Sequence, residues 1–243
     1  AEHPYVDVLV HYEGETPFRR ILRALLHGSP LDDITGLTLR RPDGTVTRTG
    51  HFVSDLPRRQ IPDAVLPSPY LRGYFDSLVN DKWRDDPMVM AVWETSRGGP
   101  YACTFCEWGD SALNKMSWFS DERAAQEFEW FARNKIHNIH AADANFGILP
   151  RDVGLAERVA ALKERYGFPK NVHMNTAKNH VDAVFRIMKR WNEVGLTIGA
   201  TIAVQSLNHD TLVAIHRENM AVTKDLELQV QYQKLRIPTY VEF

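Results

Sequence analysis

Cys103 and Cys106 are the residues whose types and spacing most clearly suggest chemistry. They are the only cysteines among 243 residues, and they form a C-x-x-C pair. Two thiolates at this spacing can bind one tetrahedral metal ion or two corners of an iron–sulfur cluster. A buried cysteine pair or a redox dithiol fits the spacing equally well. The spacing alone therefore leaves these interpretations open.

Polar side chains recur on one face of five predicted strands. Because strand side chains alternate between faces, parity assigns one polar and one apolar set. The polar set is Glu94, Asn138, His140, His173, Asn175, Thr201, Gln205, Tyr240 and Glu242. The apolar set, expected to meet helices, is Val92, Ile139, Val172, Met174, Ile202, Val204 and Val241. A hydrogen-bonded sheet interior is one interpretation; we favour a polar lumen that binds a polar ligand at the carboxyl ends of the strands.

Three histidines suggest a zinc site as an alternative. His137, His140 and His173 could join the two cysteines around one metal ion. However, His137 and His140 have opposite parity on one predicted strand. We therefore expect hydrogen-bonded histidines rather than a zinc enzyme.

The elements that must position these residues form repeating strand–loop–helix units after about residue 88. Helices are predicted over 120–135, with Ser120 as N-cap, over 151–166, and after residue 180. Such repeats predict a parallel sheet with helices packed against it. The sequence before residue 55 predicts a strand, a helix that ends near Gly28, and a hairpin around Pro42–Gly44.

Composition restricts the class of protein. Hydrophobic residues make up 44% and charged residues 25%, which is typical of a globular protein with a core. The net charge of -2 gives no basic surface for nucleic acid, and no apolar run is long enough for a membrane span. The N-terminal sequence lacks the pattern of a secretory signal, so we expect a cytoplasmic protein without nucleic-acid or membrane partners.

The segment "TSRGGPYACTFCEWG" resembles the cluster loop of radical S-adenosylmethionine (radical SAM) enzymes, whose core is C-x-x-x-C-x-aromatic-C. Gly99, Cys103, Phe105 and Cys106 occupy the four defining positions, so the first cysteine position holds glycine. The segments "VDVLVHYEGETPFRRILRAL", "LPSPY", "ADANFGI" and "QSLNHDTLVAIHREN" resemble the branch that carries a cobalamin-binding domain.

The resemblance implies a fold and a domain order. We expect an α/β protein in which residues 88–243 form a partial parallel (βα) barrel of about five strands, truncated at the C-terminus. Residues 1–54 would be a fragment of a doubly wound cobalamin-binding domain, and residues 55–87 a proline-rich linker. The chain stops in mid-strand, so we expect a piece of a longer protein.

The resemblance also implies an activity. Such enzymes use a [4Fe–4S] cluster to cleave SAM reductively, and with cobalamin the usual outcome is methyl transfer. A small-molecule substrate in natural-product biosynthesis and an electron donor such as flavodoxin or ferredoxin would be the partners. The protein contributes the position and tuning of these cofactors.

Roles can be transferred residue by residue. Cys103 and Cys106 would ligate the cluster, and Phe105 would pack near the adenine. Asp143 and Asn145 would lie near the methionine end of SAM, although a helix-capping turn is the alternative. Residues expected to meet the ribose or carboxylate are Asn175 or Lys178, and Gln205 with Ser206; for Lys178 a solvated position is an equal alternative.

Gly99 limits this interpretation, because a hydrogen atom cannot ligate iron. We expect an enzyme that is impaired as written. One alternative is a non-catalytic descendant that binds SAM or a partner protein without a stable cluster. Another is a zinc or redox C-x-x-C protein.

Overall fold

The computed structural model describes residues 3–51, 59–101, 103–106, 116–178, 180–196, 199–219 and 222–242. Contacts divide the chain into two compact units, Ala1–Leu56 and Pro57–Phe243. Each unit has its own cluster of buried hydrophobic side chains. The division into a cobalamin-domain fragment, a linker and a barrel stays a prediction.

The first unit is a small antiparallel sheet with one helix. Strands β1 (Val8–Val10), β2 (Leu37–Arg40) and β3 (Val46–Arg48) pair in that order, and helix α1 spans Glu15–His27. Gly28 ends α1 with a left-handed backbone, φ 65°, which glycine adopts without steric cost. Ile21 on α1 packs with Leu37 and Leu39 on β2. The predicted helix and hairpin are confirmed.

The described residues of the second unit include the three helices predicted over 120–135, over 151–166 and after residue 180, two short helices within the predicted linker, and two helices nearer the C-terminal end. They are α2 (Asp76–Leu78), the π-helix η1 (Val79–Trp83), α3 (Asp121–Arg133), α4 (Asp152–Tyr166), α5 (Val181–Glu193), α6 (His209–Ala214) and α7 (Val222–Lys234). Ser120 caps α3 as expected, because its Oγ accepts a hydrogen bond of 3.2 Å from the Arg123 N–H. No helix of the described segments is both long and apolar enough to cross a membrane.

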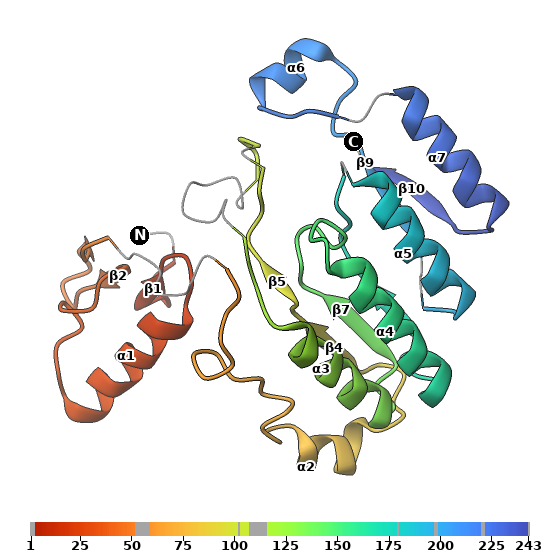
Figure 1. Cartoon of the computed structure of the whole chain (residues 1–243). Coiled ribbons are helices and arrows are strands. Elements are labelled where there is room, and N and C mark those ends of the chain that lie inside the picture. Colours follow the sequence, from red (N-terminus) through yellow and green to blue (C-terminus); the bar gives the residue numbers. More distant parts are fainter. Residues whose placement is uncertain are drawn as a thin grey trace. The chain divides into compact units, whose positions relative to one another are not determined.

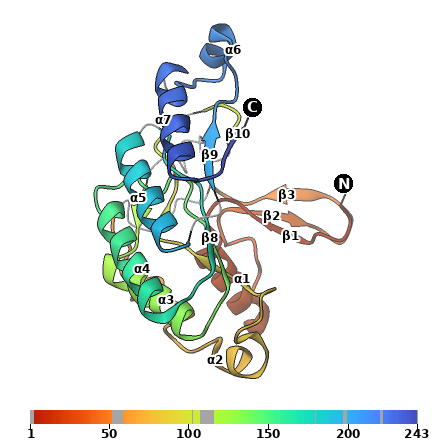
Figure 2. The same ribbon diagram turned by 90° about the vertical axis from the view of Figure 1, so that its right-hand side faces the viewer.

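Parallel strands form the other layer of this unit. They are β4 (Met90–Trp93), β7 (Asn138–Ala141), β8 (Asn171–His173), β9 (Ala200–Ala203) and β10 (Thr239–Glu242). Strands β4, β7 and β8 pair in parallel, as do β9 and β10. Figures 1 and 2 show α3, α4, α5 and α7 along one side of these strands. The five parallel strands are confirmed, whereas their closure into one partial barrel stays a prediction.

Large aromatic side chains fill the space between strands and helices. Trp93, Phe128 and Trp191 are fully buried, and the two indole N–H groups donate to backbone carbonyls at 3.1 and 3.0 Å. Burial of such rings is strongly favourable once their polar atoms are paired. This core fixes the strands whose carboxyl ends carry the candidate site.

One assignment of a strand face is wrong. Val92 is in register with His140 and is 52% exposed, whereas its neighbour Trp93 is buried. Residues in register point to the same side, so Val92 lies on the face of His140 and Trp93 meets the helices. Val241 is in register with Ile202 and so lies on the predicted face, but it is 38% exposed; β9 is the only strand paired with β10 in the described residues. The other predicted apolar residues, Ile139, Val172, Met174, Ile202 and Val204, are buried.

Candidate cofactor-binding site

A cavity of about 250 Å³ lies at the carboxyl ends of the parallel strands, where a site was predicted. The cysteine loop (residues 98–116), the segments after β7 and β8, the end of β9, the segment after α6, and α7 all contribute to its wall. Polar or sulfur-containing wall residues include Cys103, Cys106, Asn145, Asn175, Lys178, Gln205, Arg217 and Asn219. The fold therefore gathers side chains that are far apart in sequence around one cavity.

The cysteine loop brings its two thiols to this cavity. A turn between them is closed by a 3.1 Å hydrogen bond from the Cys106 N–H to the Cys103 carbonyl. Cys103 is 8% exposed and Cys106 is half-buried, and both thiols are free. Gly99 lines the same cavity. The three positions of the predicted cluster motif thus share one wall, although Ala102 and residues 107–115 are outside the described residues.

A short antiparallel ladder forms the stem of this loop. Strand β5 (Ser96–Arg97) pairs with β6 (Ser117–Trp118). The Phe119 N–H extends the ladder by donating to the Thr95 carbonyl at 2.9 Å. The sequence analysis did not predict these strands, since two-residue strands have no periodicity to detect.

Asp143 joins the stem to the segment after β7. Its Oδ1 accepts from the Thr95 and Ser96 N–H groups at 2.7 and 3.1 Å. Its Oδ2 accepts from the two hydroxyls, at 2.5 Å from Thr95 and 2.9 Å from Ser96. Burial raises the pKa of Asp143 to about 6, although these hydrogen bonds act in the opposite direction. The carboxyl group is therefore buried and fully engaged with the stem.

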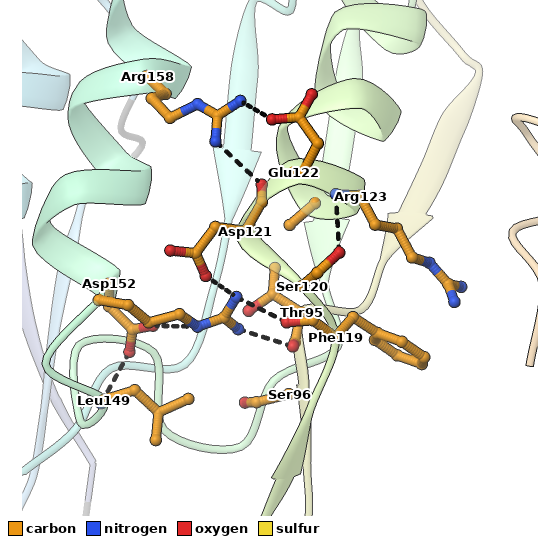
Figure 3. A network of polar contacts seen from close by, with 12 residues as sticks. Thr95, Ser96, Phe119, Ser120, Asp121, Glu122, Arg123, Leu149, Asp152 and Arg158 are labelled. Carbon is orange, nitrogen blue, oxygen red and sulfur yellow. Dashed lines mark hydrogen bonds and ion pairs between the residues drawn. The ribbon is translucent and has the colours of Figure 1, made fainter. Parts of the chain in front are cut away.

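Arg151, at the start of α4, contacts the same stem from another direction. Its Nη2 donates to the Thr95 carbonyl at 2.8 Å, and its Nη1 donates to the Phe119 carbonyl at 2.9 Å and to Asp121 at 2.8 Å. Figure 3 shows Thr95, Phe119 and Asp121 converging on this network, with Arg158 and Glu122 pairing beside it. The base of the cysteine loop is thus tied to both α3 and α4.

Arg217 is a cavity residue that the sequence analysis missed. It is 6% exposed; Nε donates to Asn219 at 2.7 Å and Nη2 donates to the Ala203 carbonyl. Nη1 is buried and has no hydrogen-bond partner among the described residues. A buried cationic donor without a partner is costly unless a ligand supplies one. The available signal was the arginine in "HREN", at the end of the segment "QSLNHDTLVAIHREN" that resembles the cobalamin-containing branch.

The other predicted site residues divide into two groups. Phe105, Asn145, Asn175 and Gln205 line the cavity, as does Lys178. Gln205 has a left-handed backbone, φ 64°, which is uncommon for a side chain of this size and turns the chain sharply after β9. Asp143 and Ser206 are not among the lining residues, and the Ser206 hydroxyl accepts from the Asn208 N–H at 3.1 Å. All the predicted contacts with SAM stay predictions.

The histidines do not gather around the cysteines. His140 and His173 stack on each other with ring centroids 5.4 Å apart, whereas the His137 Nε2 lies 3.0 Å from the Asp85 carboxylate. In the described part of the chain, no group of three or more His, Cys, Asp or Glu side chains could hold a metal ion. Within the described residues, the three histidines of the zinc alternative are therefore engaged with other partners.

Comparison with solved structures supports the architecture. No family model matches the chain. Its fold is similar to that of the radical SAM methyltransferase TsrM from Kitasatospora setae, with cobalamin and a [4Fe–4S] cluster bound, at a TM-score of 0.68 and 16% identity. The match covers 99% of this chain and 47% of TsrM. At this identity the likeness concerns the fold alone.

Sequence comparison shows common ancestry as well as a similar fold. The chain is homologous to cobalamin-dependent radical SAM methyltransferases. One relative is 2-(S-pantetheinyl)-carbapenam-3-carboxylate methyltransferase of Streptantibioticus cattleyicolor, 42% identical over 243 residues. Another is the cobalamin-dependent radical SAM methyltransferase TokK of Streptomyces tokunonensis, 41% identical over 242 residues. These matches cover 100% and 99% of this chain but 35% of each relative. The chain thus spans about a third of the curated relatives it matches.

Proposed function

We propose that this chain is the SAM-binding segment of a cobalamin-dependent radical SAM methyltransferase, and that Gly99 impairs its loading with a [4Fe–4S] cluster. One observation carries the proposal: a single cavity joins the two thiols of the cysteine loop to polar strand ends and to the buried Arg217. Homology to two methyltransferases over nearly the whole chain supports the same class.

The donors present fit only part of such a cluster. Three thiolates would leave one iron open for SAM, but this chain offers Cys103 and Cys106, with glycine at the first cysteine position of the motif. Gly98 has a left-handed backbone, φ 86°, whereas Gly99 does not. The φ angle at Gly99 therefore adds no penalty of the kind expected at Gly98 when cysteine replaces the glycine.

The cavity fits SAM better than it fits the cluster. A carboxylate at the unpartnered Nη1 of Arg217 would satisfy a buried donor through a charge-assisted hydrogen bond. The amides of Asn145, Asn175 and Gln205 can pair with the amino, ribose and carboxylate groups of SAM. The ring of Phe105, 50% exposed at the cavity, offers a surface for the adenine.

The remaining parts of the proposal concern the whole protein. The substrate would be a small molecule in natural-product biosynthesis, methylated with the help of cobalamin, and an electron donor such as flavodoxin or ferredoxin would reduce the cluster. The first unit would belong to the cobalamin-binding domain. We place the protein in the cytoplasm, where cysteines stay reduced.

The first test is iron and acid-labile sulfide per chain after anaerobic reconstitution, with an absorbance spectrum, on the full-length protein. We compare the natural sequence with Gly99→Cys and use Gly99→Ser as a matched control that adds a side chain but no thiol. Uptake of about four irons by Gly99→Cys alone supports the proposal. If none of the three proteins takes up iron and sulfide, the loop is not a cluster site and the proposal fails.

A non-catalytic SAM-binding descendant is the second candidate, and Gly99 is the observation that favours it. Equilibrium dialysis with radiolabelled SAM tests the binding that this candidate requires. Binding by the natural sequence without iron, lost in Arg217→Met but kept in the surface control Arg158→Met, supports this candidate. If the natural sequence takes up a full cluster, the second candidate fails.

A further inference from the structure

The stem of the cysteine loop depends on one carboxylate from a distant segment. Asp143 accepts four hydrogen bonds from Thr95 and Ser96, residues 48 and 47 positions away in sequence. An ionised carboxylate has about four acceptor positions, so the capacity of this group is already used. Its oxygens cannot also bind a cofactor unless they release part of the stem.

Thr95 is held at every polar atom. Its N–H and hydroxyl donate to Asp143, while its carbonyl accepts from the Phe119 N–H and from Arg151. The residue is 0% exposed, so water cannot replace these partners. Gly99 follows Thr95 by four positions, so the start of the cysteine loop inherits this fixed orientation.

We propose that Asp143 is a positioning residue: it holds Thr95 and Ser96 so that Gly99, Cys103 and Cys106 face the cavity, and it does not itself bind SAM. The purpose of this orientation rests on the proposed function. The positioning of Thr95 and Ser96 by Asp143 rests on the four hydrogen bonds alone, and it can be tested without a cluster or SAM.

The test is the rate at which N-ethylmaleimide alkylates each cysteine of the protein, followed by mass spectrometry after proteolysis. Cys103 is buried and Cys106 is more accessible, so their ratio reports the local position of the loop. We expect Asp143→Ala to raise the Cys103 rate, relative to Cys106, about tenfold. Asp143→Asn keeps an oxygen acceptor for the two backbone N–H groups, so we expect at least half of this change to be reversed.

Asn138→Ala is the control, at the start of β7, the strand that precedes the Asp143 segment. The Asn138 amide donates to the Pro87 and Val89 carbonyls and accepts from Asn171, far from the loop in the register of β7. The control should lower global stability and leave the ratio of the two rates unchanged. An equal rise in the control would mean that general destabilisation exposes Cys103, which overturns the inference.

Substitutions of the donor residues test the same positioning role if the Asp143→Ala variant does not fold. Thr95→Val and Ser96→Ala each remove one donor to Asp143 and should each raise the relative Cys103 rate. An unchanged rate in both of these variants would overturn the inference.

SAM binding distinguishes this inference from the proposed function. If Asp143 contacted SAM directly, Asp143→Ala would weaken SAM binding and leave the Cys103 rate unchanged, which overturns the positioning role. The Cys103 alkylation rate can rise as expected while Gly99→Cys takes up no cluster and no variant binds SAM. In that case the positioning role of Asp143 is supported and the proposed function fails.

Discussion

At position 99 the chain presents a hydrogen atom to a cavity that two thiols also line. Under the proposed function, glycine here would remove a ligand and leave the local fold in place, because the stem and the turn between the cysteines are formed without a side chain at position 99.

Asp143 predicts a pH dependence of stability. Burial raises its pKa in the folded protein from 3.8 to about 6, so the protonated form favours folding. This contribution is full below about pH 4 and is lost as the pH rises through about 6, by roughly 3 kcal/mol for a shift of this size. Asp143→Asn removes the titration, so the free energies of unfolding of the two proteins should diverge between pH 4.5 and 7.5, with the wild type losing stability.

Urea denaturation at four pH values in this range measures the effect. Asp152→Asn is a useful control, since burial also raises the pKa of Asp152, but its carboxylate accepts from the Gly147 and Leu149 N–H groups rather than from the stem. Curves for wild type and Asp143→Asn that stay parallel across the range would show that the pKa of Asp143 is not raised.

At the scale of elements, helix α3 holds the segment that precedes the strands. The Arg123 guanidinium donates to Glu127 at 3.1 Å and to the Leu66 carbonyl, and it lies 3.8 Å from the centre of the Phe119 ring. Both charged side chains are buried, and burial raises the pKa of Glu127. Replacing both partners of a buried ion pair by apolar residues changes the free energy of unfolding little. Removing only one partner lowers it strongly, because the other charge stays buried without a counter-charge.

Arg123→Met should therefore lower the free energy of unfolding by about 3–5 kcal/mol, because it leaves the Glu127 carboxyl group without its cation. The double variant Arg123→Met/Glu127→Leu should recover most of this loss. Urea denaturation of the wild type and both variants measures these free energies of unfolding. A double variant less stable than the single variant would mean that the pair itself stabilises the fold.

At the scale of the whole molecule, the described residues form two separate clusters of buried hydrophobic side chains. Phe128 belongs to the cluster of the second unit, and Leu37 and Leu39 belong to that of the first. Because the clusters share no residues, damage to one should not be transmitted through the packing of the other. The stability of this chain is therefore better described by two local values than by one.

Phe128→Ala tests this expectation, since emptying such a site costs about 3–5 kcal/mol. Hydrogen exchange followed by mass spectrometry should show faster exchange in α3, α4, α5 and β7, with the protection of β2 unchanged. Faster exchange in β2 by the same factor would show that the two units unfold together.

Local patterns in the sequence were enough to predict α1, the hairpin, α3 with its Ser120 cap, and the order of parallel strands and helices. The cysteine loop was also predicted, because a motif is a local pattern of residue types. These features depend on interactions within a few positions along the chain, which periodicity and capping residues report directly.

Only the tertiary structure decided which distant groups meet. The face of Val92, the stem of the cysteine loop, the attachment of Asp143 to Thr95 and the burial of Arg217 against Ala203 all depend on contacts between separate elements. A sequence states that a carboxylate or a guanidinium is present, but its burial and hydrogen-bond partners determine what it does. Those partners are set by packing across the fold, and no local pattern of residues encodes them.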